Sequence, residues 1–136
     1  MDEQANLQTV QGFYRTVNDG DLAATLKLIA DDLDWKDVGA DKDIYFWSTP
    51  VHGREEFERY GQALFEALEF QAFQPDEFIV GRDTVVVLAH ERCLVRATGR
   101  VVEANWAQIF TLRDGLICKF REYSDTAAWE AGVAKR

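Results

Sequence analysis

Three long strands joined by two tight turns are predicted in the last third of the chain. Residues 82–96, 102–112 and 116–123 are rich in β-branched and apolar residues, and glycine-containing turns at 97–99 and 113–115 separate them. The second turn carries Asp114-Gly115, and an Asp-Gly pair supplies the positive φ that a hairpin requires. Because long sheets twist, we expect these strands to curl, helices to fill the curl, and a conical hollow to form.

Helices and shorter strands are predicted in the first two thirds of the chain. The spacing of apolar residues and the positions of capping residues indicate them. In chain order they are a helix at about residues 4–18, a helix that starts after Asp21 and turns Leu22, Leu26 and Ile29 inward, a strand at 33–38, a helix from Gly53 to about Leu68, a strand at 70–80 that Pro75 makes an edge or bulged strand, and a short helix that holds Trp129 after Ser124 or Asp125. This order, α-α-β-α-β-β-β-β-α, predicts an α+β fold.

The size and composition predict one globular domain over residues 1–136. The chain is 47% hydrophobic, which is too apolar for a disordered protein, and it has no linker-like segment. Its net charge of −9 argues against binding to nucleic acid or to an anionic membrane. The polar N-terminal segment, the lack of an apolar run of about 20 residues, and two cysteines without a Cys-x-x-Cys spacing lead us to expect a cytoplasmic protein with reduced, buried Cys93 and Cys118.

Three segments resemble a SnoaL-like domain of the NTF2-like superfamily, to which the ketosteroid isomerases are related. They are FYRTVNDGDLAATLKLIADDLDWKD at 13–37, GREEFERYGQALFEAL at 53–68 and DTVVVLAHERCLVRATGRVVEANWAQIFTLRDGLICKFREYSDTAAW at 83–129. The resemblance implies an NTF2-like (cystatin-like) cone, in which a curved, mostly antiparallel sheet wraps around three helices. It also implies a homodimer built on the outer face of the sheet. The superfamily includes isomerases, cyclases, dehydratases, epoxide hydrolases and non-catalytic adaptors, so fold alone does not decide the reaction.

Alternation along the three long strands sorts their side chains between the two faces of the sheet. We expect the more apolar set to face the hollow: Val87, Ala89, Glu91, Cys93, Val95, Ala104, Trp106, Gln108, Phe110, Leu112, Leu116, Cys118, Phe120 and Glu122. The other set is expected on the outer, dimer-forming face, and it includes Leu88, Leu94, Ile109, Ile117, Arg92, Arg96 and Arg121. A β-bulge would exchange the faces beyond it.

Asp37 is the candidate catalytic base. By resemblance it occupies the position of the carboxylate base in ketosteroid isomerases, and Gln108 occupies that of a protonated aspartic acid, while Phe13, with Tyr14 next to it, occupies that of a tyrosine donor. A dry, aromatic pocket raises the pKa of a carboxyl group toward neutrality. We therefore expect Asp37 as base and Gln108 as donor to a developing oxyanion; for Asp37 the alternative is a solvated carboxylate at a strand end.

Two further carboxyl groups and an aromatic wall complete the candidate site. Glu91 or Glu122 is a possible second acid–base group, although the interpretation that we favour for both is an ion pair with Arg92, Arg96 or Arg121. The residues expected to bind the substrate are Trp35, Trp106, Phe110, Phe13, Tyr14 and Phe120. The Tyr45-Phe46-Trp47 cluster is expected as a pocket lid or a dimer contact.

The function predicted from these residues is cofactor-independent general acid–base catalysis on a hydrophobic, cyclic carbonyl compound by an isomerase, a cyclase or a dehydratase. Two alternatives remain open, a small-molecule binding module and a dimeric adaptor whose cone is only a filled core. His52 and His90 have no metal-binding spacing, so no metal site is predicted. No cofactor-binding motif is found either, so we expect no cofactor.

Overall fold

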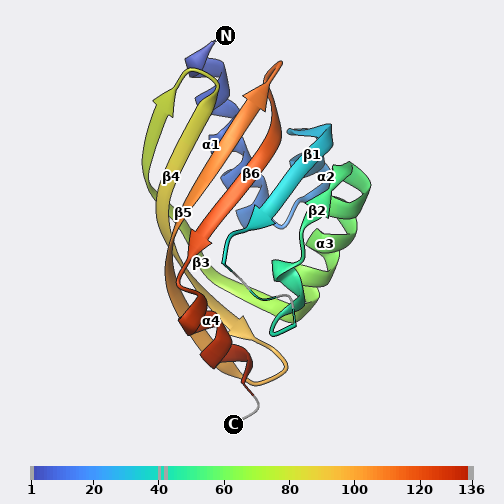
Figure 1. Ribbon diagram of the computed structural model, residues 1–136, viewed down its shortest axis with the longest axis vertical. Helices are drawn as coiled ribbons and strands as arrows, with labels where there is room; N and C mark the ends of the chain where they lie inside the picture. Colours follow the sequence, from blue (N-terminus) through green and yellow to red (C-terminus); the bar gives the residue numbers. More distant parts are fainter. Residues whose placement is uncertain (1, 40, 42, 135–136) are drawn as a thin grey trace.

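A six-stranded curved sheet with helices against its concave face forms the described part of the chain (Figure 1). The computed structural model describes residues 2–39, 41 and 43–134. The helices are α1 Glu3–Asn18, α2 Leu22–Leu26, α3 Gly53–Ala67 and α4 Thr126–Val133, with a 3-10 turn η1 at Phe46–Ser48. The strands are β1 Ile29–Asp37, β2 Val51–His52, β3 Leu68–Gly81, β4 Thr84–Val95, β5 Arg100–Arg113 and β6 Leu116–Ser124. The fold is α+β, as predicted.

The strand order across the sheet is β2-β1-β6-β5-β4-β3. Neighbouring strands are antiparallel except for β1 and β6, which run parallel. This parallel pair joins the first strand of the chain to the last. It places the end of β1 next to β6 at the centre of the sheet, and Asp37 is the register partner of Glu122 there.

The turns between the long strands have the geometry that their residues indicate. Asp114 and Gly115 have φ values of 55° and 78°, so both lie in the left-handed region that a two-residue hairpin turn uses. β3 lies at the edge of the sheet, and its register to β4 shifts on both sides of Pro75, at Phe70/Ala72 and at Pro75/Glu77. The predicted edge or bulged strand is therefore confirmed.

The second helix is shorter than its pattern indicated. Asp21 caps α2 as predicted, with its side chain accepting a hydrogen bond from the Ala24 amide at 3.0 Å. The helix nevertheless ends at Leu26, and Ile29 begins β1 because it pairs with Ile117 of β6. β1 thus starts four residues earlier than the predicted strand. The two-residue strand β2 had no signal in the sequence, since it is too short to show alternation.

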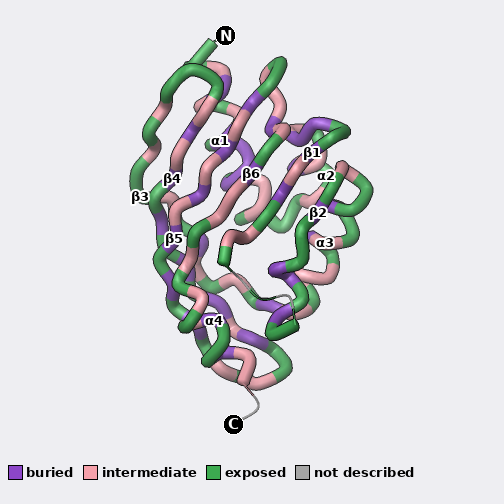
Figure 2. The backbone as a smooth tube through the Cα atoms, in the orientation of Figure 1, coloured by how far each residue is buried: buried purple, intermediate pink, exposed green. Residues whose placement is uncertain are grey.

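Burial alternates along β4 and β5 as predicted, with the expected residues on the concave face (Figure 2). β6 departs from the prediction, because its register to β5 shifts between Thr111 and Leu112. Cys118 is the extra residue of this bulge, and Ile117, which we placed on the outer face, is fully buried in the core. Beyond the bulge Phe120 and Glu122 return to the concave face, while Cys118 is only partly buried.

The core fills the cone between the sheet and the helices. α1 contributes Val10, Phe13 and Tyr14, which pack against buried residues of β1, β4, β5 and β6. A second cluster at the other end joins the 45–47 segment to Trp129 of α4. None of the described helices is long and apolar enough to cross a membrane.

Candidate functional site

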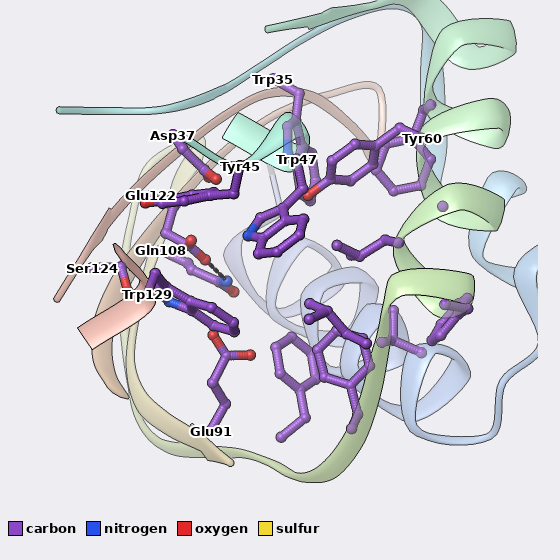
Figure 3. Close-up of a pocket in the computed structure, with 18 of the residues that line it drawn as sticks. Trp35, Asp37, Tyr45, Trp47, Tyr60, Glu91, Gln108, Glu122, Ser124 and Trp129 are labelled. Carbon is purple, nitrogen blue, oxygen red and sulfur yellow. Dashed lines mark hydrogen bonds between the residues drawn. The ribbon is translucent and has the colours of Figure 1, made fainter. Parts of the chain in front are cut away.

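A cavity lies between the concave face of the sheet, α3, the 45–47 segment and α4 (Figure 3). The cavity has a volume of about 90 Å³, enough for several waters or a small organic molecule. The sheet contributes a polar wall made of Asp37, Glu91, Gln108, Glu122 and Ser124. The rest of the lining is mainly apolar and aromatic, and it includes Tyr45, Trp47, Phe57, Tyr60, Leu64, Phe65 and Trp129. Among the described residues that line the cavity, none is Lys, Arg or His.

Asp37 and Glu122 form a hydrogen-bonded pair of carboxyl groups in this cavity. Register partners on adjacent strands point to the same face, so both side chains are directed into the hollow. Burial raises the pKa of both groups, and the negative charge of Glu122 raises the pKa of Asp37 further. The hydrogen bond between the two groups raises the pKa of Asp37 and lowers that of Glu122, so they titrate as one coupled pair.

Gln108 of β5 lies beside Glu122 of β6 and fixes the orientation of the Glu122 side chain. Its amide nitrogen donates to Glu122 Oε1 at 2.5 Å, as the dashed line in Figure 3 marks. Its amide oxygen accepts a hydrogen bond from the Tyr14 hydroxyl, also at 2.5 Å. A chain of hydrogen bonds therefore runs from Tyr14 through Gln108 to Glu122. Because the amide nitrogen carries two hydrogens, one remains for a ligand oxygen.

Glu91 is the third carboxyl group of the cavity, and it stands apart from the pair. It is 6% exposed, and burial followed by the charge of Glu122 raises its pKa. Its only hydrogen bond from a described residue comes from the Cys93 thiol at 3.8 Å, which is a weak contact. Burial also raises the pKa of Cys93, so this thiol stays protonated at neutral pH.

The expected ion pairs of Glu91 and Glu122 with arginine are wrong. Arg92 pairs with Glu103, Arg96 lies 3.9 Å from Glu69, and Arg121 binds Asp34 at 2.9 Å. All three arginines belong to the set on the outer face, whereas Glu91 and Glu122 alternate to the concave face. Consecutive residues of a strand point to opposite faces of the sheet, so Glu91 and Glu122 cannot reach the arginines next to them in the sequence.

The predicted substrate-binding residues fall into two groups. Phe13 and Trp35 line the cavity. The other four lie in the core cluster behind the lining: Tyr14, Trp106, Phe110 and Phe120. Trp35 stacks on Phe120 with ring centroids 3.5 Å apart, and Tyr14 stacks on Trp106 at 5.9 Å. These core rings therefore support the residues that face the ligand space.

Several residues that line the cavity were not predicted from the sequence as site residues. Tyr60 belongs to the apolar stripe of α3, yet its hydroxyl-bearing ring lines the cavity, and burial raises its pKa well above the ordinary value. Burial raises the pKa of Tyr45 to about 12. Trp129 lines the cavity beside Ser124, and its ring nitrogen donates a 3.2 Å hydrogen bond to the Ser124 hydroxyl. The only available signal was the aromatic 45–47 cluster, whose Tyr45 and Trp47 do line the cavity.

No set of three His, Cys, Asp or Glu side chains arranged for a metal ion occurs in the part of the chain that the structure describes. Neither His52 nor His90 is among the residues that line the cavity. His90 contacts Asp76 at 3.0 Å on the exposed face of β4. His52 is the residue that precedes α3, and its backbone amide donates to Glu56.

Comparisons with known proteins identify the fold. The sequence model of the SnoaL-like domain matches residues 10–120. An NTF2-like protein from Burkholderia xenovorans is 26% identical, with 98% of this chain and 99% of its own covered and a TM-score of 0.86. The cone predicted from the NTF2-like resemblance is thus confirmed. No curated protein matches the sequence significantly.

More distant structures share the same fold. A proposed isomerase from Rhodopseudomonas palustris is 16% identical, with 96% of this chain and 98% of its own covered and a TM-score of 0.79. A proposed SnoaL-like polyketide cyclase from Mesorhizobium loti is 20% identical, with 86% and 97% covered and a TM-score of 0.71.

Proposed function

Because the chain belongs to the SnoaL-like domain family, we propose that its cavity performs cofactor-independent general acid–base catalysis on a hydrophobic, cyclic carbonyl compound. The reaction is of the isomerase, cyclase or dehydratase type. The observation that carries this proposal is the hydrogen-bonded pair Asp37–Glu122 in an aromatic cavity. The names of two structural neighbours, a proposed isomerase and a proposed polyketide cyclase, agree with this reaction class.

The pair suits proton transfer because it holds one proton between two carboxyl groups. Its carboxylate accepts a proton from the carbon next to the substrate carbonyl, and its carboxylic acid returns a proton to another atom of the substrate. A positioned base of this kind contributes about 10²- to 10⁴-fold to a proton transfer. Burial raises the pKa of both groups, which strengthens the base and favours the protonated form of the acid.

Gln108 has two roles in this proposal. One amide hydrogen holds Glu122, and the other binds the oxygen on which negative charge develops. Tyr14 acts as a positioning residue, because its hydroxyl fixes the amide oxygen of Gln108 and so directs the amide hydrogens toward Glu122 and the cavity.

A non-catalytic binding module is the second candidate. The cavity reaches Asp37, which supports either an enzyme or a binding module over an adaptor with a filled core. The buried, proton-sharing carboxyl pair favours the enzyme, because a module that only holds an apolar ligand gains nothing from the cost of burying two acids.

We also propose that the protein is a homodimer. None of the described helices packs over the outer face of β4, β5 and β6 (Figure 1), and this face exposes Leu88 and Tyr123 by 39% and 50%. A broad sheet face with apolar side chains needs cover, and a two-fold pairing of the same face supplies it.

The catalytic proposal is tested by hydrogen exchange on a model ketone. 2-Tetralone, a bicyclic ketone, is incubated with the protein in D₂O, and proton NMR follows the loss of the signals of the carbon next to the carbonyl. We expect the native protein to accelerate this exchange. Asp37→Asn removes the shared proton with almost no change in shape, and it should lower the rate by about 10²-fold or more.

Asp32→Asn is the matched control, because Asp32 lies on the same strand, is exposed and pairs with Arg113. It should exchange 2-tetralone at the native rate. If the native protein exchanges no faster than buffer, or if Asp37→Asn keeps the native rate, the catalytic proposal is wrong.

A further inference from the structure

The cavity holds three carboxyl groups, and none of the described residues that line it is Lys, Arg or His. Asp37 and Glu122 stabilise each other through their hydrogen bond, and Gln108 adds a further donor. Glu91 receives no comparable hydrogen bond from a described residue. Its only hydrogen bond from the described residues is the 3.8 Å contact from the Cys93 thiol, although the residue is 6% exposed. A buried carboxyl group without a strong donor is costly, so its retention calls for a partner that the protein alone does not supply.

Glu91 faces the same hollow as the pair but from a different position on the sheet. Gln108 pairs with Val87 of β4, and Glu91 lies four residues further along that strand. Four residues span about 13 Å of extended strand, and the curvature of the sheet directs both ends of this span into one cavity. In Figure 3 the carboxyl group of Glu91 points into the cavity below Trp129, while Asp37 and Glu122 occupy the upper end. The cavity therefore has two separate acidic positions.

Aromatic rings line the cavity together with Glu91. Tyr45, Trp47 and Trp129 pack against one another, with ring centroids 5.0 Å apart for Tyr45–Trp47 and 5.8 Å apart for Trp47–Trp129. All three belong to the same apolar cluster as Cys93, the neighbour of Glu91. Faces of Trp and Tyr attract cations through their ring quadrupoles, and they do so most strongly where water is excluded.

We propose that the cavity binds a hydrophobic molecule that carries a protonated amine, with the ammonium group against Glu91 and the rings of Trp47 and Trp129. This inference rests on the proposed function only for the other end of the ligand, which would lie at Asp37–Glu122. In the complex the ammonium donates hydrogen bonds to Glu91 and favours its ionised form, so the proton that burial retains on free Glu91 is released when the amine binds. The net charge of −9 further raises the local concentration of cations at the protein surface.

An anionic ligand fits the cavity poorly. It would meet three carboxyl groups and no lining Lys, Arg or His among the described residues. A neutral ligand gains the aromatic wall but leaves Glu91 without a charged partner. The charge of the ligand is therefore the property that separates these cases.

The test compares three ligands of similar size by isothermal titration calorimetry at pH 7 and 0.15 M salt. They are 2-phenylethylamine, which is a cation, 2-phenylethanol, which is neutral, and phenylacetate, which is an anion. We expect the amine to bind about 10-fold or more tightly than the alcohol, since a charge-assisted hydrogen bond in a buried site is worth that much. Phenylacetate should bind more weakly than both.

Glu91→Gln should remove the preference for the amine, so that the amine and the alcohol bind with nearly equal affinity. Glu91→Asp keeps the charge and should keep part of the preference. Glu58→Gln is the matched control, because it removes the same charge from an exposed position on α3, outside the cavity. It should keep the full preference.

Three results would overturn the inference. The first is equal affinity of the native protein for the amine and the alcohol. The second is loss of the preference in Glu58→Gln as well as in Glu91→Gln, which would assign it to the overall field of the protein. The third is its loss in Asp37→Asn but not in Glu91→Gln, which would place the ammonium at the carboxyl pair. The exchange of 2-tetralone, which has no amine, is measured separately, so the proposed function and this inference can fail independently.

Discussion

Asp37 and Glu122 are register partners on the parallel strands β1 and β6, and their carboxyl groups share a hydrogen bond inside the cavity. Adjacent strands in register place side chains on the same face, so the meeting of these two acids follows directly from the strand pairing. Gln108, the register partner of Glu122 on β5, completes a row of three polar residues across the sheet.

The carboxyl pair predicts a bell-shaped pH dependence of 2-tetralone exchange. At low pH the pair gains a second proton and loses its base, and at high pH it loses the shared proton and with it the acid. Because the pKa of both groups is raised, we expect both limbs above the pH at which an exposed carboxyl group titrates. In Glu122→Gln the exchange rate should no longer show a bell-shaped dependence on pH. Rate measurements between pH 4 and 10 would test this. A pH-independent rate in the native protein would contradict the pair as the acid–base unit.

Gln108 and Tyr14 predict graded losses of turnover. Gln108→Leu removes both amide contacts and should lower the rate of exchange by about 10²-fold or more, as deletion of an oxyanion donor does. Tyr14→Phe removes only the hydroxyl that orients Gln108, so it should lower the turnover number less and leave the Michaelis constant nearly unchanged. Steady-state kinetics of both variants provide the measurement. Equal effects of the two variants on the Michaelis constant alone would assign them to ligand binding.

The buried carboxyl group of Glu91 should make the free energy of unfolding decrease as pH rises. Burial raises its pKa in the folded protein, whereas in the unfolded chain the pKa has its usual value of about 4.3. Between these two values the folded state retains a proton that the unfolded state has released, so the free energy of unfolding falls with rising pH. Asp37 and Glu122, which also face the cavity with raised pKa values, act in the same direction.

Glu91→Gln lacks this titration, so its melting temperature should fall less between pH 5 and pH 8 than that of the native protein. At pH 8 the variant should be the more stable of the two. Thermal unfolding followed by circular dichroism measures both values, with Glu58→Gln as the control. A native melting temperature that rises from pH 5 to pH 8 while Glu91→Gln follows it in parallel would contradict this assignment.

The outer face of the sheet predicts a dimer that a single charge disrupts. Leu88 lies on β4 in a shallow hollow with Ala107 and Tyr123. Light scattering should give twice the 15.5 kDa mass of the chain for the native protein and a single chain mass for Leu88→Glu, because the substitution buries a charge at the two-fold contact. Arg59→Glu, a change of exposed charge on α3 and away from the outer face of the sheet, serves as the control. A native monomer at micromolar concentration would count against the dimer.

The sequence by itself determined most of the secondary structure. Alternation placed Glu91 on the concave face of β4 and Gln108 on that of β5, and Asp114-Gly115 specified the hairpin between β5 and β6. These features depend on local backbone preferences and on a period of two residues, both of which a single sequence carries. The resemblance of the chain also predicted the cone and the position of Asp37 at the end of β1.

Only the tertiary structure decided how these elements meet. The bulge at Cys118 reversed the face of Ile117, and the parallel pairing of β1 with β6 brought Asp37 to Glu122. The arginines that were expected to neutralise Glu91 and Glu122 lie on the opposite face of the sheet, and they pair there with Glu103, Glu69 and Asp34 instead. Register between strands that are distant in sequence depends on packing of the whole sheet rather than on local preference, and for this reason no segment of the sequence encodes it alone.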